Sequence, residues 1–193
     1  MKHFGFDLDN TLIDYSRSCE QYTKQRGLPI CANIKDLRKM LKPDELESSN
    51  WTLAQSWIYG KGLQYAVIEA EVIPLLKSLV NKGWQVSIHS HKTKFGPVAY
   101  GSVPLREMMI DWIENSSLSD FFTINQNLNF YDDLDSKVEG IASQNLNGYV
   151  DDLAAVFLHS NYPRHIKSYL YQGTDLDLGW LMTIQSFKDI CYD

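Results

Sequence analysis

Residues 4–12 read FGFDLDNTL, a short apolar run that ends in two aspartates, Asp7 and Asp9, followed at once by Asn, Thr and Leu. Side chains two positions apart on an extended strand point to the same face. We therefore expect both carboxylates to converge at the carboxyl end of a strand over residues 2–7. Two converging carboxylates repel each other unless a cation or a proton intervenes, so the stretch indicates a divalent cation site in which one carboxylate can also attack phosphorus. A plain structural turn is the alternative, because Asp and Asn often end strands by bonding their own backbone.

The composition is that of an ordinary folded protein. The 193 residues suffice for one domain with a sizeable core and a small accessory lobe; 44% are hydrophobic and 22% charged. The formal net charge of −6 and the lack of a long basic stretch argue against nucleic-acid binding. The three cysteines, Cys19, Cys31 and Cys191, are too scattered for a disulfide framework or a zinc site. With no signal peptide and no apolar run long enough to span a membrane, we expect a cytoplasmic protein.

Hydrophobic periodicity and Gly/Pro punctuation divide the chain into alternating strands and helices. Strands are expected over 2–7, 84–89, 121–125, 148–150 and 166–171. Helices are expected over 16–27, 33–41, 50–67, 71–82, 103–115, 136–145, 153–158 and 186–190. Such alternation predicts an α/β fold, a Rossmann-like parallel sheet with helices on both faces, whose ligands bind at the carboxyl ends of the strands.

Polar residues stand at three further positions where this sheet should bind a ligand. Ser90 follows the second strand; Lys137 stands near the start of a helix for which Ser136 is the expected cap; Asp151 and Asp152 follow the apolar pair before them. A helix N-terminus favours anions, and a lysine there adds a point charge for phosphate. Each residue also has an ordinary interpretation, as a turn serine, a solvated lysine or a solvated acidic pair.

Together these motifs resemble, in order across residues 4–153, the four motifs of the haloacid dehalogenase (HAD) superfamily, of the phosphatase type. The first and last motifs are the most specific. The resemblance implies a HAD-like core domain over residues 1–14 and 71–193, with a small helical cap inserted over residues 15–70. Trp51, Trp57, Tyr59 and Tyr65 would form either an apolar wall over the substrate or the core of the cap itself, and exposed aromatics could make a homodimer surface.

The resemblance also implies a mechanism. Asp7 would attack the phosphoryl group to give an aspartyl-phosphate, and Asp9 would act as general acid and then general base. A small-molecule phosphomonoester would be the substrate.

The same resemblance implies the ligand set. Mg2+ would be bound by the Asp7 carboxylate, the backbone carbonyl of Asp9 and Asp151, with Asp152 ligating through water or orienting a neighbour. Phosphate would be bound by residues Thr11, Ser90, His91 and Lys137; His91 replaces an Asn common in the superfamily.

Two points stay open. A phosphotransferase or phosphomutase would use the same intermediate, and a non-catalytic scaffold would bind a phosphorylated ligand or a protein partner. Lys92 and Lys94, in the loop expected over 92–102, would either contact a second anionic group of the substrate or be solvated.

Overall fold

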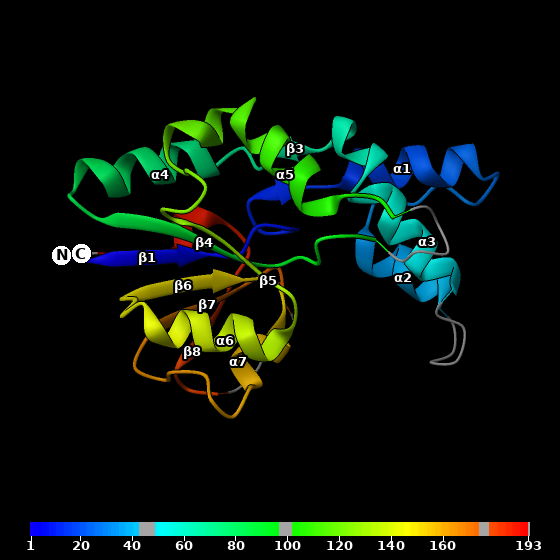
Figure 1. Cartoon of the computed structure of the whole chain (residues 1–193). Helices are drawn as coiled ribbons and strands as arrows, with labels where there is room; N and C mark the ends of the chain where they lie inside the picture. Colours follow the sequence, from blue (N-terminus) through cyan, green and yellow to red (C-terminus); the bar gives the residue numbers. More distant parts are fainter. Residues whose placement is uncertain (43–48, 97–101, 174–177, 193) are drawn as a thin grey trace. The chain divides into compact units, whose positions relative to one another are not determined.

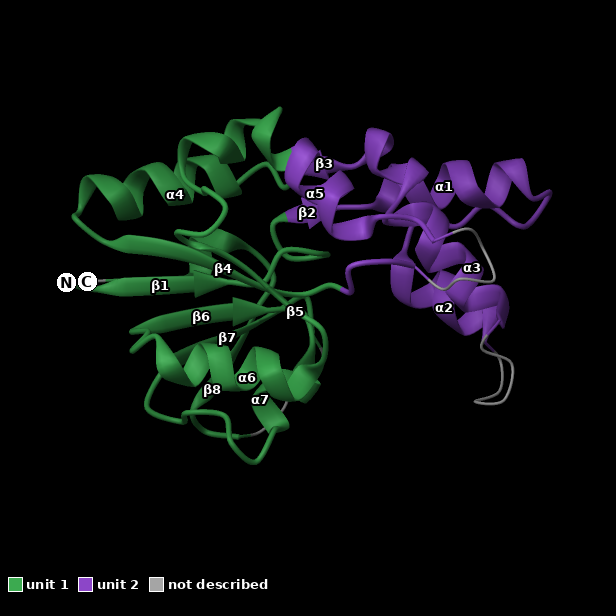
Figure 2. Cartoon of the chain, in the orientation of Figure 1, with its two compact units in different colours: residues 1–12, 69–92, 113–193 green, residues 13–68, 93–112 purple. Residues whose placement is uncertain are grey.

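The computed structural model describes residues 1–42, 49–96, 102–173 and 178–192. The chain forms two compact units (Figure 2): unit 1 comprises residues 1–12, 69–92 and 113–193, and unit 2 comprises residues 13–68 and 93–112. The sequence-based division assigned 93–112 to the core domain, whereas the structure groups this segment with the inserted lobe.

Unit 1 contains a six-stranded parallel sheet in the order β5-β4-β1-β6-β7-β8, which confirms the predicted fold class. The strands are β1 (His3–Phe6), β4 (Gln85–His91), β5 (Leu128–Tyr131), β6 (Gly148–Asp151), β7 (Lys167–Tyr171) and β8 (Leu181–Ile184). The first strand lies at the centre, because Phe4 is in register with both Val86 of β4 and Gly148 of β6. The chain therefore moves outward from β1 in both directions, and the carboxyl ends of β1, β4 and β6 meet at one edge.

Helices cover both faces of this sheet (Figure 1): α4 (Val72–Asn81) lies on one face, and α6 (Leu134–Ser143) and α7 (Ala154–Leu158) lie on the other. Helix α4 buries the stripe Val72, Leu75, Leu76 and Leu79. Helices α6 and α7 bury Val138, Ile141, Val156 and Phe157 in a cluster with Tyr149 of β6 and Leu170 of β7. The short 3-10 helices η3 (Ser117–Asp120) and η4 (Phe187–Asp189) complete the connections, and helix α5 (Leu105–Glu114) begins in unit 2 and ends in unit 1.

Several predicted elements are wrong in extent or position. The strand expected over 121–125 is absent; Phe122 N–H donates to Leu118 O, which continues the η3 turn, and the strand forms at β5 instead. The strand expected over 166–171 is not the last, because β8 follows it. Helix α6 begins at Leu134, since Asp133 rather than Ser136 caps it, its carboxylate accepting from Ser136 N–H at 2.7 Å. Lys137 therefore lies past the first turn rather than at the helix start.

Unit 2 is mainly helical. It contains α1 (Ser16–Gln25), α2 (Ile34–Leu41), α3 (Ser49–Ile58), η1 (Lys61–Tyr65) and the antiparallel pair β2 (Ile13–Asp14) and β3 (Val67–Ile68). Asn33 caps α2, its Oδ1 accepting from Lys35 N–H at 2.8 Å. The helix expected over 50–67 instead ends before Gly60 and continues as η1.

The aromatic side chains of unit 2 pack on one another. The Trp57 ring lies 5.6 Å from Tyr22 and 6.3 Å from Tyr65, centroid to centroid, and the Tyr59 ring lies 5.0 Å from Tyr15. These contacts support the interpretation that at least part of this set forms the lobe's own core.

The two ends of the chain lie together at the amino edge of the sheet (Figure 1). The Trp84 ring, directly before β4, contacts the Lys2 ammonium at 5.1 Å and the Tyr192 ring at 6.4 Å. Among the described helices, none has both the length and the apolar character that a membrane crossing requires.

Candidate active site

Asp7 follows the central strand and is fixed by backbone and side-chain contacts. Its N–H donates to Val150 O at 2.8 Å, and one carboxylate oxygen accepts from Thr11 Oγ1 at 3.2 Å. The chain then turns: Asn10 has φ +61°, a left-handed conformation that Asn tolerates, and Leu12 N–H reaches back to Leu8 O. Because β1 ends at Phe6, the strand alternation on which the expected convergence of Asp7 and Asp9 was based does not extend over these two residues.

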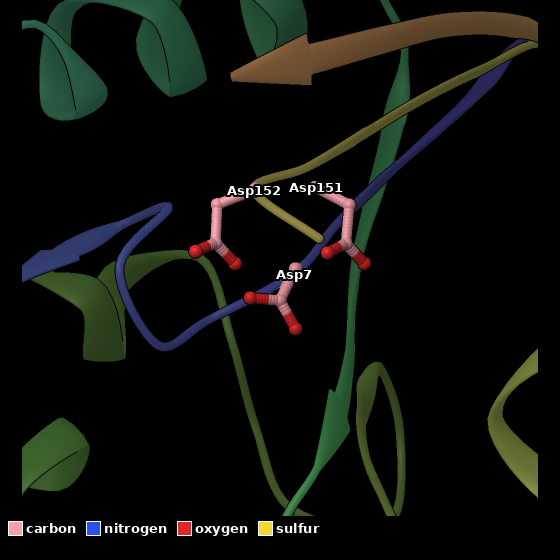
Figure 3. A group of neighbouring side chains, drawn as sticks. All are labelled: Asp7, Asp151 and Asp152. Atoms are coloured by element: carbon pink, nitrogen blue, oxygen red, sulfur yellow. The ribbon is translucent and has the colours of Figure 1, made fainter. Parts of the chain in front are cut away.

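The partners of Asp7 come instead from the end of β6. One carboxylate oxygen from each of Asp7, Asp151 and Asp152 lies within 4.8 Å of the other two, and Figure 3 shows the three side chains side by side. Asp7 and Asp151 are buried, and Asp152 is partly exposed. The parallel β1–β6 pairing brings the two acidic motifs together.

Lys137 bridges two of these carboxylates. From α6, its Nζ donates to Asp7 Oδ1 at 2.6 Å and to Asp151 Oδ2 at 2.7 Å, and its side chain is 3% exposed. Burial disfavours the ammonium, but Asp151 and Asp7 outweigh that effect and raise the pKa of Lys137 above its ordinary value. Burial raises the pKa of Asp7 well above its usual range, and Lys137 acts against that rise.

Asp151 is oriented by two further donors. Its Oδ2 accepts from Tyr149 OH at 2.8 Å, and its Oδ1 accepts from Leu153 N–H at 2.9 Å. Burial, with the charges of Asp151 and Asp7, raises the pKa of Tyr149 well above its ordinary value, so its hydroxyl remains a donor. Sequence reasoning missed Tyr149; the available signal was its position two residues before Asp151 on a strand, which places both on one face.

A chain of hydrogen bonds between side chains joins β5, β4 and β1. His89 contacts Tyr131 OH through Nδ1 at 3.0 Å and Ser87 Oγ through Nε2 at 3.0 Å, and Ser87 Oγ also contacts His3 Nε2 at 2.8 Å. Burial, with the charges of Lys137 and His3, lowers the pKa of His89 to about 3, so the ring is neutral. Gly5 is required beside it, since a Cβ there would lie 2.9 Å from the Tyr149 ring and 3.3 Å from His89.

Ser90, the predicted phosphate ligand on β4, is buried, and its Oγ has no hydrogen-bond partner among the described residues. Buried hydroxyls are nearly always paired, so an orphan one marks a position where a ligand or ion is expected. Ser87, on the same strand, differs from Ser90 in that its Oγ contacts both His3 and His89.

The remaining predicted residues lie differently from expectation. Asp9 is outside the three-carboxylate group; its Oδ2 forms an ion pair with Lys92 Nζ at 2.7 Å. Lys92 is therefore buried rather than solvated. The exposed His91 ring contacts Asp132 O at 3.1 Å through Nε2. Residues 97–101 of the predicted 92–102 loop lie outside the described part of the chain.

The charge balance of the group suits a divalent cation. When all three are ionised, the carboxylates carry three negative charges, and the Lys137 ammonium that contacts two of them carries a single positive charge. Mg2+ prefers hard carboxylate oxygens. The residues present thus fit the metal that the resemblance implies.

Comparison with solved structures identifies the fold. A haloacid dehalogenase-like family protein from Streptococcus pneumoniae aligns with a TM-score of 0.60 at 17% identity, covering 95% of this chain and 93% of that one. The chain has the HAD-like fold. A predicted phosphatase from Clostridium acetobutylicum aligns at 0.56 and 16% identity, covering 95% and 94%. Protein tyrosine kinase A of Mycobacterium tuberculosis aligns at 0.60 and 16% identity, covering 97% and 94%.

No protein-family model matches the HAD-like chain, and no curated protein matches it either. At these identities the solved structures share the fold with this chain, and the chemistry must be argued from its own residues.

Proposed function

We propose that the protein is a Mg2+-dependent phosphatase that hydrolyses a small-molecule phosphomonoester through an aspartyl-phosphate on Asp7. The observation that carries this proposal is the buried Asp7–Lys137–Asp151 arrangement at the carboxyl edge of the sheet. The orphan Ser90 hydroxyl on the neighbouring strand supports it, because a phosphoryl oxygen would supply the missing partner.

The chain's own residues suffice to describe both steps. The Asp7 carboxylate attacks phosphorus, the bond from phosphorus to the ester oxygen breaks, and Asp9 gives its proton to the departing alcohol. Asp9 then takes a proton from the water that attacks the phosphorus of the aspartyl-phosphate, which frees Asp7 and releases phosphate. Lys137 and Ser90 stabilise the charge that spreads over the phosphoryl oxygens.

Asp7, Asp151 and Asp152 would hold the metal, with the backbone carbonyl of Asp9 as a further ligand. When bound, Mg2+ would neutralise charge on the phosphoryl group. We further propose that unit 2 selects the substrate and that the enzyme acts in the cytoplasm; its free cysteines, Cys19, Cys31 and Cys191, are compatible with that location. Homodimer formation and the absence of nucleic-acid binding stay predictions.

A phosphotransferase is the second candidate, since one structure of the same fold is named a protein tyrosine kinase. The two reactions share the attack by Asp7 and differ only in whether water or another acceptor takes the phosphoryl group.

The test is turnover of p-nitrophenyl phosphate and a panel of sugar phosphates, nucleotides and phosphorylated acids, with Mg2+ and then with EDTA. We expect metal-dependent phosphate release that Asp7→Asn abolishes, to below about one-thousandth of the wild-type rate, while Asp36→Asn on the exposed surface of α2 has no effect. Acid quenching should trap the phosphorylated wild-type protein. Activity surviving in Asp7→Asn would refute the assignment of the nucleophile, and no turnover of any phosphoester would favour the non-catalytic scaffold.

A further inference from the structure

The buried ion pair between Lys92 and Asp9 is not accounted for by phosphate or metal binding. Lys92 directly follows β4, and its N–H donates to Tyr131 O at 3.0 Å, which extends the β4–β5 ladder by one bond. Its backbone is therefore fixed by the sheet. Its side chain is 3% exposed, and Nζ lies 2.7 Å from Asp9 Oδ2.

Burying an ammonium group costs several kcal/mol unless a carboxylate compensates it. Asp9 supplies that compensation, so the two side chains depend on each other for their positions. A surface lysine pair such as Lys39–Asp36, whose side chains are 80% and 65% exposed, carries no comparable constraint.

The two buried lysines, Lys92 and Lys137, thus contact different acidic residues. Lys137 contacts Asp7 and Asp151, the residues assigned to nucleophile and metal, whereas Lys92 contacts Asp9, the residue assigned to proton transfer. Asp9 stands beyond the end of β1, directly before the turn of residues 10–12, so the pairings of β1 with β4 and β6 do not extend to it. An oriented proton-transfer group is worth about 10²- to 10⁴-fold in rate, and that gain requires a defined position.

We propose that Lys92 is a positioning residue for the reaction, which directs the Asp9 carboxyl group toward the leaving-group oxygen, to which its protonated form gives a proton, and then toward the attacking water, from which its ionised form takes one. This inference rests on the proposed function and adds to it a residue that acts through Asp9 rather than on the phosphoryl group. It replaces the earlier alternatives for Lys92, a substrate contact or a solvated side chain.

The loss of Lys92 should affect the two chemical steps differently, depending on the leaving group. p-Nitrophenolate leaves without proton donation, so formation of the aspartyl-phosphate from p-nitrophenyl phosphate depends little on Asp9. Alkyl phosphates need a proton on the leaving oxygen, and hydrolysis of the intermediate needs a base for every substrate. Loss of the orienting ammonium should therefore slow alkyl-phosphate turnover in both steps and p-nitrophenyl phosphate turnover in the second step alone.

The test is Lys92→Met, compared with Lys92→Arg and with Lys77→Met, which removes an exposed lysine of α4. For Lys92→Met in stopped flow we expect a burst of p-nitrophenol near one equivalent, a steady-state kcat about 10²-fold below wild type, a KM that falls together with kcat because hydrolysis of the intermediate limits turnover, and phosphorylated protein trapped by acid. Alkyl-phosphate turnover should fall at least as far with no burst. Lys92→Arg should recover much of the rate, and Lys77→Met should match wild type.

Circular dichroism and thermal melts establish that each variant is folded. If Lys92→Met does not fold, the test uses Lys92→Arg: a folded Lys92→Arg with the burst and the KM of wild type supports a positive charge that holds Asp9. A raised KM with unchanged kcat would overturn the proposal by making Lys92 a substrate contact, and so would an unchanged kcat in folded Lys92→Met. Absence of turnover by the wild type would overturn the proposed function and this inference together, whereas normal wild-type turnover with an unaffected Lys92→Met would overturn this inference alone.

Discussion

Lys137 Nζ lies 2.6 Å from Asp7 Oδ1, although 130 residues separate the two in the chain. The contact exists because β1 is the central strand and α6 packs against the face toward which Asp7 points. The same ammonium reaches Asp151 at 2.7 Å, so one side chain ties the beginning of the chain to the acidic motif after β6.

Removing this ammonium should cost stability as well as activity. In Lys137→Met two buried carboxylates lose their common partner, and we expect the free energy of unfolding to fall by about 3 kcal/mol. Urea titration measures the loss. Millimolar Mg2+ should restore more stability to Lys137→Met than it adds to wild type, since the cation replaces the missing charge; equal effects on both proteins would contradict the charge balance described for the site.

Ser90→Ala should lower the activity of the protein without lowering its stability. Because Ser90 Oγ has no partner, its removal should leave the free energy of unfolding unchanged or raise it by about 1 kcal/mol, while phosphatase kcat/KM falls by about 10²-fold. Ser87→Ala is the matched control on the same strand: Ser87 bonds both His3 and His89, so this variant should lose stability. A destabilised Ser90→Ala would show that the hydroxyl has a structural partner.

Metal affinity should depend on Asp152. Isothermal titration of Asp152→Asn with MgCl2 should show binding at least about tenfold weaker than wild type. Asp36→Asn, on the surface of α2, should bind Mg2+ as wild type does. An unaltered affinity in Asp152→Asn would remove this residue from the proposed ligand set.

The buried His89 predicts an acid-labile fold. Its pKa is lowered to about 3 in the folded protein against 6.5 in an unfolded chain, so between these values the unfolded state binds a proton that the folded state does not. Stability should therefore fall as pH decreases through that window, by about 1 kcal/mol per unit from this residue. Urea titrations at pH 6.5, 5.5 and 4.5 should show a shallower decline for His89→Gln than for wild type, and the wild-type slope for His165→Gln, which alters an exposed ring.

The sequence was sufficient to predict the parallel sheet and the motifs at its edge, because alternating apolar segments and strand-end acids are local signals. The sequence was insufficient to predict contacts that depend on how the segments connecting the strands pack against one another. The Lys92–Asp9 pair is one example, since a lysine in a loop gives no sign of being buried. The capping of α6 by Asp133 is another, because Ser136 offers an equally good capping pattern and only the packed position of the helix decides between them. Phe121 and Phe122 led to a wrong strand prediction, because they are apolar enough for a strand but their N–H groups are bonded within a 3-10 turn.

The packing of Lys2 and Tyr192 around Trp84 has a practical consequence. Both ends lie at the edge of the sheet opposite the carboxylates proposed to be catalytic, so an affinity handle or a fluorescent reporter fused to either end leaves the carboxylate edge unobstructed. Immobilising the protein through such a handle should preserve its kinetics, which makes surface-based substrate screening practicable.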